Sequence, residues 1–264
     1  MPVRAVSHGG PRARIRRVVR GARVDVWSVP LLLDDGALSG AAAVLSPAEL
    51  ERADRGTPLV RRRRIALRAA LRGVLAELLS IPPAEVPLVE TPRGRPEVRR
   101  PPGDRRPPLD VNCSASADTG LVAVGHGVRV GIDVEAVPAW DPATLDEGWL
   151  TSREIATLRA VDPAERGTVA TRAWTAKEAV LKGVGAGLSL PPGVLGAVLR
   201  PDGRPVRRLG PWRLAPVAVP PGLVATMATS RPLRGGRPLI IPRALHGPGW
   251  SAGRHRSEEE SRRW

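Results

Sequence analysis

The strongest pattern of apolar and polar positions lies between Thr57 and Leu79. Apolar residues recur there at intervals of three, four and seven, as on the buried side of an amphipathic helix; they are Val60, Leu67, Leu71, Val74 and Leu78. Thr57 followed by Pro58 marks the start of this helix. A shorter helix is predicted from Ser46-Pro47-Ala48-Glu49, which has the form of a capping box with proline at the first helical position.

Further along the chain the pattern switches between strand and helix periods. Residues 81–108 are crowded with Pro, Gly and Arg and predict a loop with at most a short strand at 86–89. Helices are predicted from near Thr151 and from Asp162-Pro163 through Lys182, with the glycines that follow as the stop signal. The other predicted strands are 24–29, 121–124, 128–134, 195–199, 212–219 and 223–229, with residues 125–127 as a hairpin turn. Strands and helices do not alternate strictly, which favours an α+β fold.

A second stripe on the long predicted helix is basic. It consists of Arg61, Arg64, Arg68 and Arg72 and flanks the apolar stripe. Its spacing is compatible with a solvated helix face and equally with a binding site for a polyanion. The pattern leaves both interpretations open.

Charge and composition argue against a nucleic-acid-binding, disulfide-bonded, membrane or secreted protein. The 264 residues carry a net charge of +15, but residues 1–23 account for +7 and residues 231–264 for +5. Both ends are rich in Gly, Pro and Arg, and we predict them to be disordered tails rather than specific nucleic-acid sites. A single cysteine excludes an internal disulfide. No apolar run is long enough for a membrane span or a secretory signal, so we expect a cytoplasmic protein.

Lysine is almost absent from the chain. Arginine supplies the basic residues everywhere except at Lys177 and Lys182, which lie together in the segment W-T-A-K-E-A-V-L-K. Lysine is a compact charge on a flexible stem, whereas arginine is a broad planar fork. The two surviving lysines therefore indicate a segment in which arginine cannot take their place.

Two segments of the sequence carry carboxylates that could together bind one cation. Asp133 and Glu135 alternate along a predicted strand and point to one face, a pattern that on its own is more typical of ordinary surface acids. Glu178 and Lys182 lie four residues apart on one helix face, as in an ordinary helix ion pair. A third carboxylate beside Asp133 and Glu135 would complete a Mg²⁺ site, and a lysine next to it could hold a pyrophosphate.

These motifs, in this order, resemble the surfactin-type (Sfp-type) 4′-phosphopantetheinyl transferases. The resemblance rests on G-I-D-V-E at 131–135 and on W-x-x-K-E-x-x-x-K at 174–182, followed by G-x-G-L-S-L-P at 185–191. Arg93-Gly94-Arg95-Pro96 is similar to the family's Gly-Lys-Pro element. The segment at 111–116 takes the place of its F-N-x-S-H-S motif, and Leu150 to Glu154 resembles the block between the two metal motifs. The similarity covers roughly residues 24–230.

The resemblance implies a transferase that moves the phosphopantetheine arm of coenzyme A to a serine of an acyl or peptidyl carrier protein, releasing adenosine 3′,5′-bisphosphate. Asp133, Glu135 and Glu178 would hold Mg²⁺, and Lys182 would contact the pyrophosphate. Glu178, directly or through a water, or Glu154 would accept the serine proton. The implied contacts to the phosphates of coenzyme A are Arg63, Arg72, Arg95 and Ser114.

The family fold implies two similar α+β halves related by a pseudo-twofold axis, with the site in the cleft between them. We expect the halves at 24–122 and 123–230, with the boundary near 120–127, in a monomer with flexible tails at 1–23 and 231–264.

One departure weakens the resemblance. The family histidine that meets the 3′-phosphate of coenzyme A is Ala115 here. Losing such a partner lowers affinity by on the order of 1.5–3 kcal/mol unless another group replaces it. Arg61, Arg64 or Arg68 could compensate. The alternative is a protein of the family fold with weakened catalysis that binds carrier proteins or coenzyme A.

Overall fold

The computed structural model describes residues 23–101, 103–185 and 191–232 in full. It also gives the backbone of three short strands outside these ranges, namely β1 (Ala5–Ser7), β2 (Ala13–Ile15) and β12 (Leu239–Pro242). The tails predicted to be disordered otherwise lie almost entirely outside the described residues. Where their backbone is described, β1 pairs with β2, and β12 pairs in parallel with a strand of the folded part.

In the first half of the chain, α3 (Pro58–Leu79) packs on a four-stranded sheet, and α1 (Asp35–Ala43) and α2 (Pro47–Asp54) pack on α3; one strand of the sheet, β12, comes from the C-terminal end of the chain. The sheet has the order β12-β3-β7-β6, with β3 at Arg23–Pro30, β6 at Leu109–Ser116 and β7 at Thr119–His126. A small sheet pairs β4 (Leu88–Glu90) with β5 (Pro96–Val98). The predicted starts are confirmed, because Ser46 forms a full capping box and Thr57 caps α3.

The second half repeats the combination of a four-stranded sheet and a long helix. Its sheet has the order β8-β11-β10-β9, with β8 at Val130–Ala136, β9 at Arg208–Leu209, β10 at Trp212–Val217 and β11 at Leu223–Thr229. The helices are α4 (Ser152–Ala160) and α5 (Arg166–Val184). Short 3₁₀ turns lie at Pro83–Glu85, Pro142–Asp146, Pro163–Glu165 and Pro192–Val194. As predicted, α5 ends at a glycine, Gly185, in the left-handed conformation.

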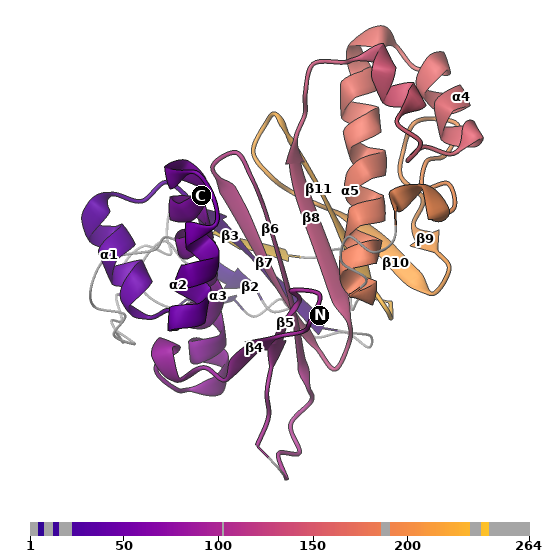
Figure 1. Cartoon of the computed structure of the whole chain (residues 1–264). Coiled ribbons are helices and arrows are strands. Elements are labelled where there is room, and N and C mark those ends of the chain that lie inside the picture. Colours follow the sequence, from indigo (N-terminus) through magenta and orange to yellow (C-terminus); the bar gives the residue numbers. More distant parts are fainter. Residues whose placement is uncertain are drawn as a thin grey trace, which may run out of the picture.

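The two sheets pack face to face between the helices (Figure 1). Side chains alternate across each strand, so one face of β3 and β7 meets α3 while the other meets the second sheet. The first contact buries Trp27, Val29, Val122 and Val124 among others. The second buries side chains from both sheets: Val26, Leu121, Ala123, Val130, Ile132, Val134, Val217, Ala225 and Met227. The order of layers is therefore helix, sheet, sheet, helix.

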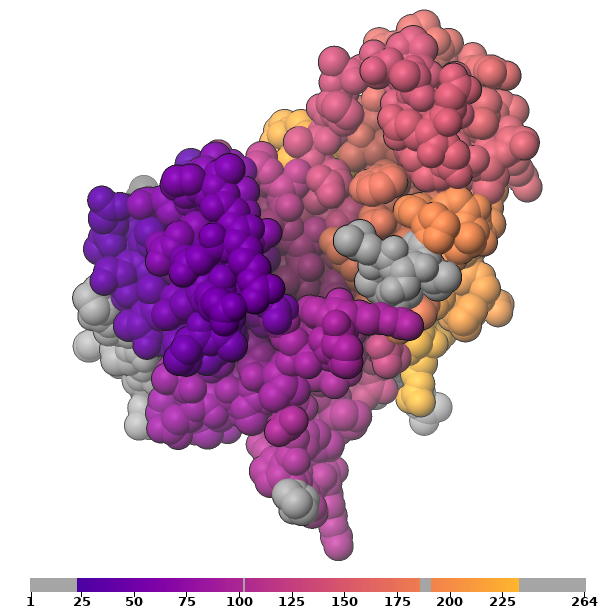
Figure 2. Space-filling view, viewed as in Figure 1, coloured from indigo at the N-terminus to yellow at the C-terminus, as the bar shows by residue number. Residues whose placement is uncertain are grey.

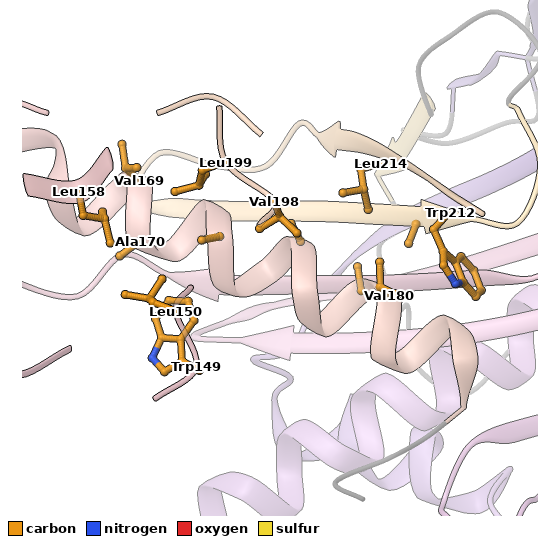
Figure 3. Close-up of a cluster of buried hydrophobic side chains, with 14 residues drawn as sticks. Trp149, Leu150, Leu158, Val169, Ala170, Val180, Val198, Leu199, Trp212 and Leu214 are labelled. Atoms are coloured by element: carbon orange, nitrogen blue, oxygen red, sulfur yellow. The ribbon is translucent and has the colours of Figure 1, made fainter. Parts of the chain in front are cut away.

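A third cluster fixes α5 on the outer face of the second sheet. Figure 3 shows Trp149 and Leu150 on one side of the helix, Val198 and Leu199 on the other, and Trp212 near its C-terminal end. The indoles of Trp149 and Trp174 meet edge to face, with their ring centroids 5.2 Å apart. Four of the seven tryptophans, Trp140, Trp149, Trp174 and Trp212, thus contribute to this core, in a chain without Phe or Tyr.

The α+β prediction is confirmed, but several local predictions are wrong. The segments predicted as a hairpin around residues 125–127 are β7 and β8, which belong to different sheets because β8 pairs with β11 instead. The predicted strand at 195–199 reduces to one bridge between Leu199 and Pro205. The sequence analysis missed β6 and α1. No described helix combines the length and apolar character that a membrane crossing requires.

Candidate active site

The site lies where α5 crosses β8, beside a hollow between the two halves. Figure 2 shows this hollow between the indigo N-terminal helices and the salmon region of α4 and α5, with the strands around β6 to β8 at its base. A glycine on each element allows the close approach. A Cβ on Gly131 would overlap the carbonyl oxygen of Ala179, and one on Gly183 would lie 2.6 Å from the Trp212 ring. The glycine of G-I-D-V-E therefore has a packing role.

Close packing brings the carboxylates of β8 to the face of α5 that carries Glu178 and Lys182. The Lys182 ammonium donates to Asp133 Oδ1 at 2.5 Å and to Ser114 Oγ at 3.0 Å. The Ser114 hydroxyl in turn donates to the same Asp133 oxygen at 2.9 Å. Asp133 is 1% exposed, whereas Lys182 is 30% exposed. A buried carboxylate is thus paired with a partly exposed lysine.

The three carboxylates affect one another's protonation. Burial raises the pKa of Asp133, although the nearby Lys182 ammonium opposes this shift. Burial also raises the pKa of Glu135, and the charge of Asp133 raises it further. The pKa of Glu178 is raised by burial and by Asp133, against the opposing effect of Lys182. Crowded carboxylates of this kind are relieved by a cation.

The donor set fits a hard divalent cation. Asp133 Oδ2 is buried and has no hydrogen-bond partner among the described residues, so one oxygen remains for a ligand. Mg²⁺ prefers carboxylate oxygens and retains several waters. Within the ranges that the structure describes, however, no three Asp, Glu, His or Cys side chains converge closely enough to form a complete metal cluster. Water would therefore have to complete the coordination.

A ladder of side chains joins the two sheets beside this site. Alternate residues of β6 accept hydrogen bonds from alternate backbone amides of β8, which is an edge strand. Asn112 Oδ1 accepts from Ile132 N at 2.9 Å, and Ser114 Oγ accepts from Val134 N at 3.3 Å. The ladder extends in both directions: Asp110 accepts from Val130 N at 2.7 Å and Ser116 from Ala136 N at 2.9 Å. Ser116 also donates to Glu135 at 3.0 Å.

Sequence reasoning missed this ladder, although it left a signal. The segment D-V-N-C-S-A-S has a polar residue at every second position, which is the period of a strand with one polar face. Asn112, the one Asn of the sequence, uses its amide oxygen for the bond to β8. Asp110 and Ser116 were not recognised as contributors to the site.

Glu154 is not placed to act as the base. It is fully buried and forms an ion pair with Lys177 at 2.8 Å. Its two carboxylate oxygens also accept bonds from Thr151 N at 2.8 Å, Thr151 Oγ1 at 2.9 Å and Val198 N at 2.8 Å. Burial alone would raise the pKa of Glu154, but these hydrogen bonds outweigh burial and lower it. The interpretation of Glu154 as a proton acceptor is corrected to a structural role.

Two of the arginines implied as phosphate contacts are also occupied within the protein. Arg72 is 3% exposed and donates to Glu49 at 2.8 Å and to backbone carbonyls of the segment 83–86. Arg95 is 6% exposed and donates to Asp110 at 2.6 Å, to Val130 O at 2.8 Å and to Lys182 O. These contacts clamp loops to strands and helices. The implied role of Arg72 and Arg95 in binding coenzyme A is not supported by their positions.

The other two implied phosphate contacts differ in position. Arg63 lies near the surface, and Ser114 lies in the site itself. Arg63 is half-buried and pairs with the exposed Asp118 at 2.7 Å, so its guanidinium could reach a ligand. Ser114 accepts from Lys182 and Val134 while it donates to Asp133, which commits its hydroxyl proton in this structure. Ala115, next in β6, is exposed.

The arginines of the basic stripe of α3 have partners within the protein. Arg61 pairs with Asp54, Arg68 with Glu90, and Arg64 donates to the carbonyls of Arg52 and Arg55. Arg72 forms an ion pair with Glu49, so the stripe connects α3 to α2 and to β4. The stripe thus connects elements of the fold, while Arg64 is exposed and Arg61 partly exposed, as on a solvated helix face.

Comparisons with known proteins agree with this geometry. The family model of the 4′-phosphopantetheinyl transferase superfamily matches residues 129–219, which include β8 and α5. The 4′-phosphopantetheinyl transferase HetI of a Nostoc species is 35% identical over 170 residues, covering 63% of this chain and 70% of HetI. A Synechocystis protein, provisionally named as a 4′-phosphopantetheinyl transferase, is 30% identical over 167 residues, covering 62% of this chain and 65% of that protein.

Part of the second motif falls outside the described residues, since the structure gives Gly185 and Pro191 but not 186–190. The remaining motif residues lie together on β6, β8 and α5. With the match to HetI over most of its length, they show that the chain belongs to the 4′-phosphopantetheinyl transferase superfamily.

Proposed function

We propose that this protein transfers the 4′-phosphopantetheine arm of coenzyme A to a serine of an apo acyl or peptidyl carrier protein. The reaction breaks the pyrophosphate bond of coenzyme A and releases adenosine 3′,5′-bisphosphate. The observation that carries the proposal is the arrangement of Asp133, Glu135 and Glu178 around the Lys182 ammonium, in a chain of this superfamily.

Asp133, Glu135 and Glu178 are the residues that would hold Mg²⁺. When bound, the ion neutralises charge on the pyrophosphate, which is the main catalytic need in phosphoryl transfer. Asp133 Oδ2 is the buried oxygen left for this purpose. Glu135 and Glu178 have partly exposed side chains, so an ion that they hold would be open to the pyrophosphate of the coenzyme.

Lys182 and Glu178 supply the remaining functions of the site. The Lys182 ammonium, on a flexible stem at the end of α5, would bind the pyrophosphate and stabilise the leaving bisphosphate. With Glu154 committed to Lys177, Glu178 is the carboxylate left to accept the serine proton, directly or through a water. Its raised pKa suits a group that takes up a proton during the reaction.

The binding of the adenosine end differs from the family pattern. With Arg72 and Arg95 occupied, Arg63 is the remaining arginine of the implied set, and the 3′-phosphate would lie near Ala115 and Arg63. Each half consists of a four-stranded sheet and a long helix, which supports a pseudo-twofold relation between the halves.

The test is a transfer assay with coenzyme A, Mg²⁺ and a set of apo carrier proteins, read by intact-protein mass spectrometry. The expected result is a gain of the mass of the phosphopantetheine arm on at least one carrier, abolished by Asp133→Asn. No gain on carriers of fatty-acid, polyketide and peptide synthesis would refute the proposal. Binding of coenzyme A or a carrier without turnover would favour the alternative of weakened catalysis, which the exposed Ala115 supports.

A further inference from the structure

We propose that Lys182 is the counter-ion of Asp133 in the metal-free protein, and that a divalent cation and the Lys182 ammonium compete for this carboxylate. The metal would then bind tightly only together with an anionic ligand that pairs with the Lys182 ammonium in place of Asp133. This inference rests on the proposed function for the identity of that ligand, the pyrophosphate of coenzyme A. Its geometry stands on the contacts of Asp133 alone.

The first step in the argument is the compensation of a buried charge. Asp133 is almost fully buried, and a buried carboxylate without a cation is strongly unfavourable. Lys182 and Ser114 both bind Oδ1, whereas Oδ2 has no hydrogen-bond partner in the described part of the chain. Lys182 is thus the cation that stabilises the aspartate, and the contacts are concentrated on one oxygen.

The second step is the freedom of Lys182 to leave. Its side chain is 30% exposed, and it lies in the last turn of α5. Lys177, five residues earlier, is fully buried and bonded to Glu154 and to the carbonyl of Trp149. Of the two lysines, only Lys182 can exchange its partner without opening the core.

The third step is the repulsion between cations on one carboxylate. A divalent ion on Asp133 Oδ2 would lie a few bond lengths from the ammonium on Oδ1, in a site with little solvent to screen them. A pyrophosphate beside the hollow would offer Lys182 a new anionic partner and remove this repulsion. Metal and coenzyme would then increase each other's affinity, as linkage requires.

The first test measures Mn²⁺ binding by electron paramagnetic resonance without coenzyme A. Lys182→Met keeps an unbranched side chain of nearly the same length and removes the charge. Arg172→Met removes one charge from the same helix, at a half-buried position away from Asp133, and serves as the matched control. We expect Lys182→Met to bind Mn²⁺ at least tenfold more tightly than the wild type, with the control unchanged. Equal affinity of Lys182→Met and wild type would overturn the proposal.

The second test uses the two-lysine composition and needs no variant. Labelled with [ε-¹³C]lysine, the protein should give two lysine ε-carbon signals, one of them buried. Titration with Mg²⁺ to saturation, confirmed by calorimetry, should move the Lys182 signal and leave that of Lys177 in place. A Lys182 signal that stays unchanged at saturation would contradict the competition.

Both readouts are independent of transfer. If they succeed while the transfer assay fails, the proposed function is wrong and the competition stands. If transfer succeeds while they fail, only the competition is wrong.

Discussion

Lys177 and Glu154 form an ion pair in which neither side chain has any exposed surface. The pair connects the middle of α5 to the start of α4 and to Val198, and the Trp149 carbonyl accepts a further bond from Lys177 at 2.6 Å. A rigid α5 is what holds the adjacent Glu178 over β8. Lys177 thus supports the geometry of the motif.

Removing one member of this pair should destabilise the fold. We expect Lys177→Met to lower the free energy of unfolding by about 3–5 kcal/mol, because it leaves a buried carboxylate without its cation. Denaturant titration followed by circular dichroism measures this. The matched control is Arg172→Met, which removes a charge from a half-buried position of the same helix and should change stability far less. Equal losses in the two variants would show that Lys177 has no special structural weight.

The close approach of β8 and α5 makes Gly131 sensitive to a single methyl group. Gly131→Ala should lower the free energy of unfolding by at least about 1–3 kcal/mol, since the new Cβ would overlap the Ala179 carbonyl and α5 would have to shift. Metal binding should weaken with it. Gly36→Ala, near the start of α1 with room for a methyl group, should instead leave stability unchanged or raise it slightly. Thermal unfolding of both variants separates the two effects.

The raised pKa of Glu178 predicts how stability depends on pH without metal. The folded state holds this proton more tightly than the unfolded chain, so stability falls as pH rises above the ordinary value of 4.5. Glu178→Gln should therefore be more stable than the wild type at neutral pH, and the difference should close as pH falls towards that value. Unfolding measured across this range in the presence of a chelator is the check. A wild type that is the more stable of the two at pH 7 would contradict the shift.

Restoring the family histidine should strengthen the binding of coenzyme A. We expect Ala115→His to lower the apparent KM for coenzyme A on the order of tenfold to a hundredfold, because a charged contact to phosphate would be regained. The position is exposed and accepts the larger side chain. Ala139→His, also exposed, is the control for a nonspecific effect of histidine. An unchanged KM would mean that another group already holds the 3′-phosphate.

Local signals in the sequence predicted the elements with clear caps and periods. Ser46 and Thr57 cap their helices as expected, and α3 begins and ends where its apolar stripe does. Thr151 caps α4, whereas Asp162 caps a 3₁₀ turn and α5 begins only at Arg166. The prediction that β7 pairs with β8 was wrong. Two consecutive strands joined by a glycine turn have the same sequence pattern whether they belong to one sheet or to two. Only the partner strands, far away in sequence, decide between these outcomes.

The sequence predicted several residues of the site correctly, but it did not predict the contacts that the other candidate residues make. The motif residues Asp133 and Lys182 meet, but Arg72, Arg95 and Glu154 are committed to partners whose positions follow from the packed fold. An arginine that binds a phosphate and one that binds a loop carbonyl have the same sequence signature. Burial and the nearest acceptor distinguish them, and both are tertiary properties.

The ladder from β6 to β8 also limits how a partner protein can dock. An edge strand normally offers its free amides to another chain, which can add itself as an extra strand. Here the amides of Val130, Ile132, Val134 and Ala136 are already bound by side chains of β6. Strand addition is therefore closed at this edge, and a protein entering the hollow must be recognised through its side chains and shape.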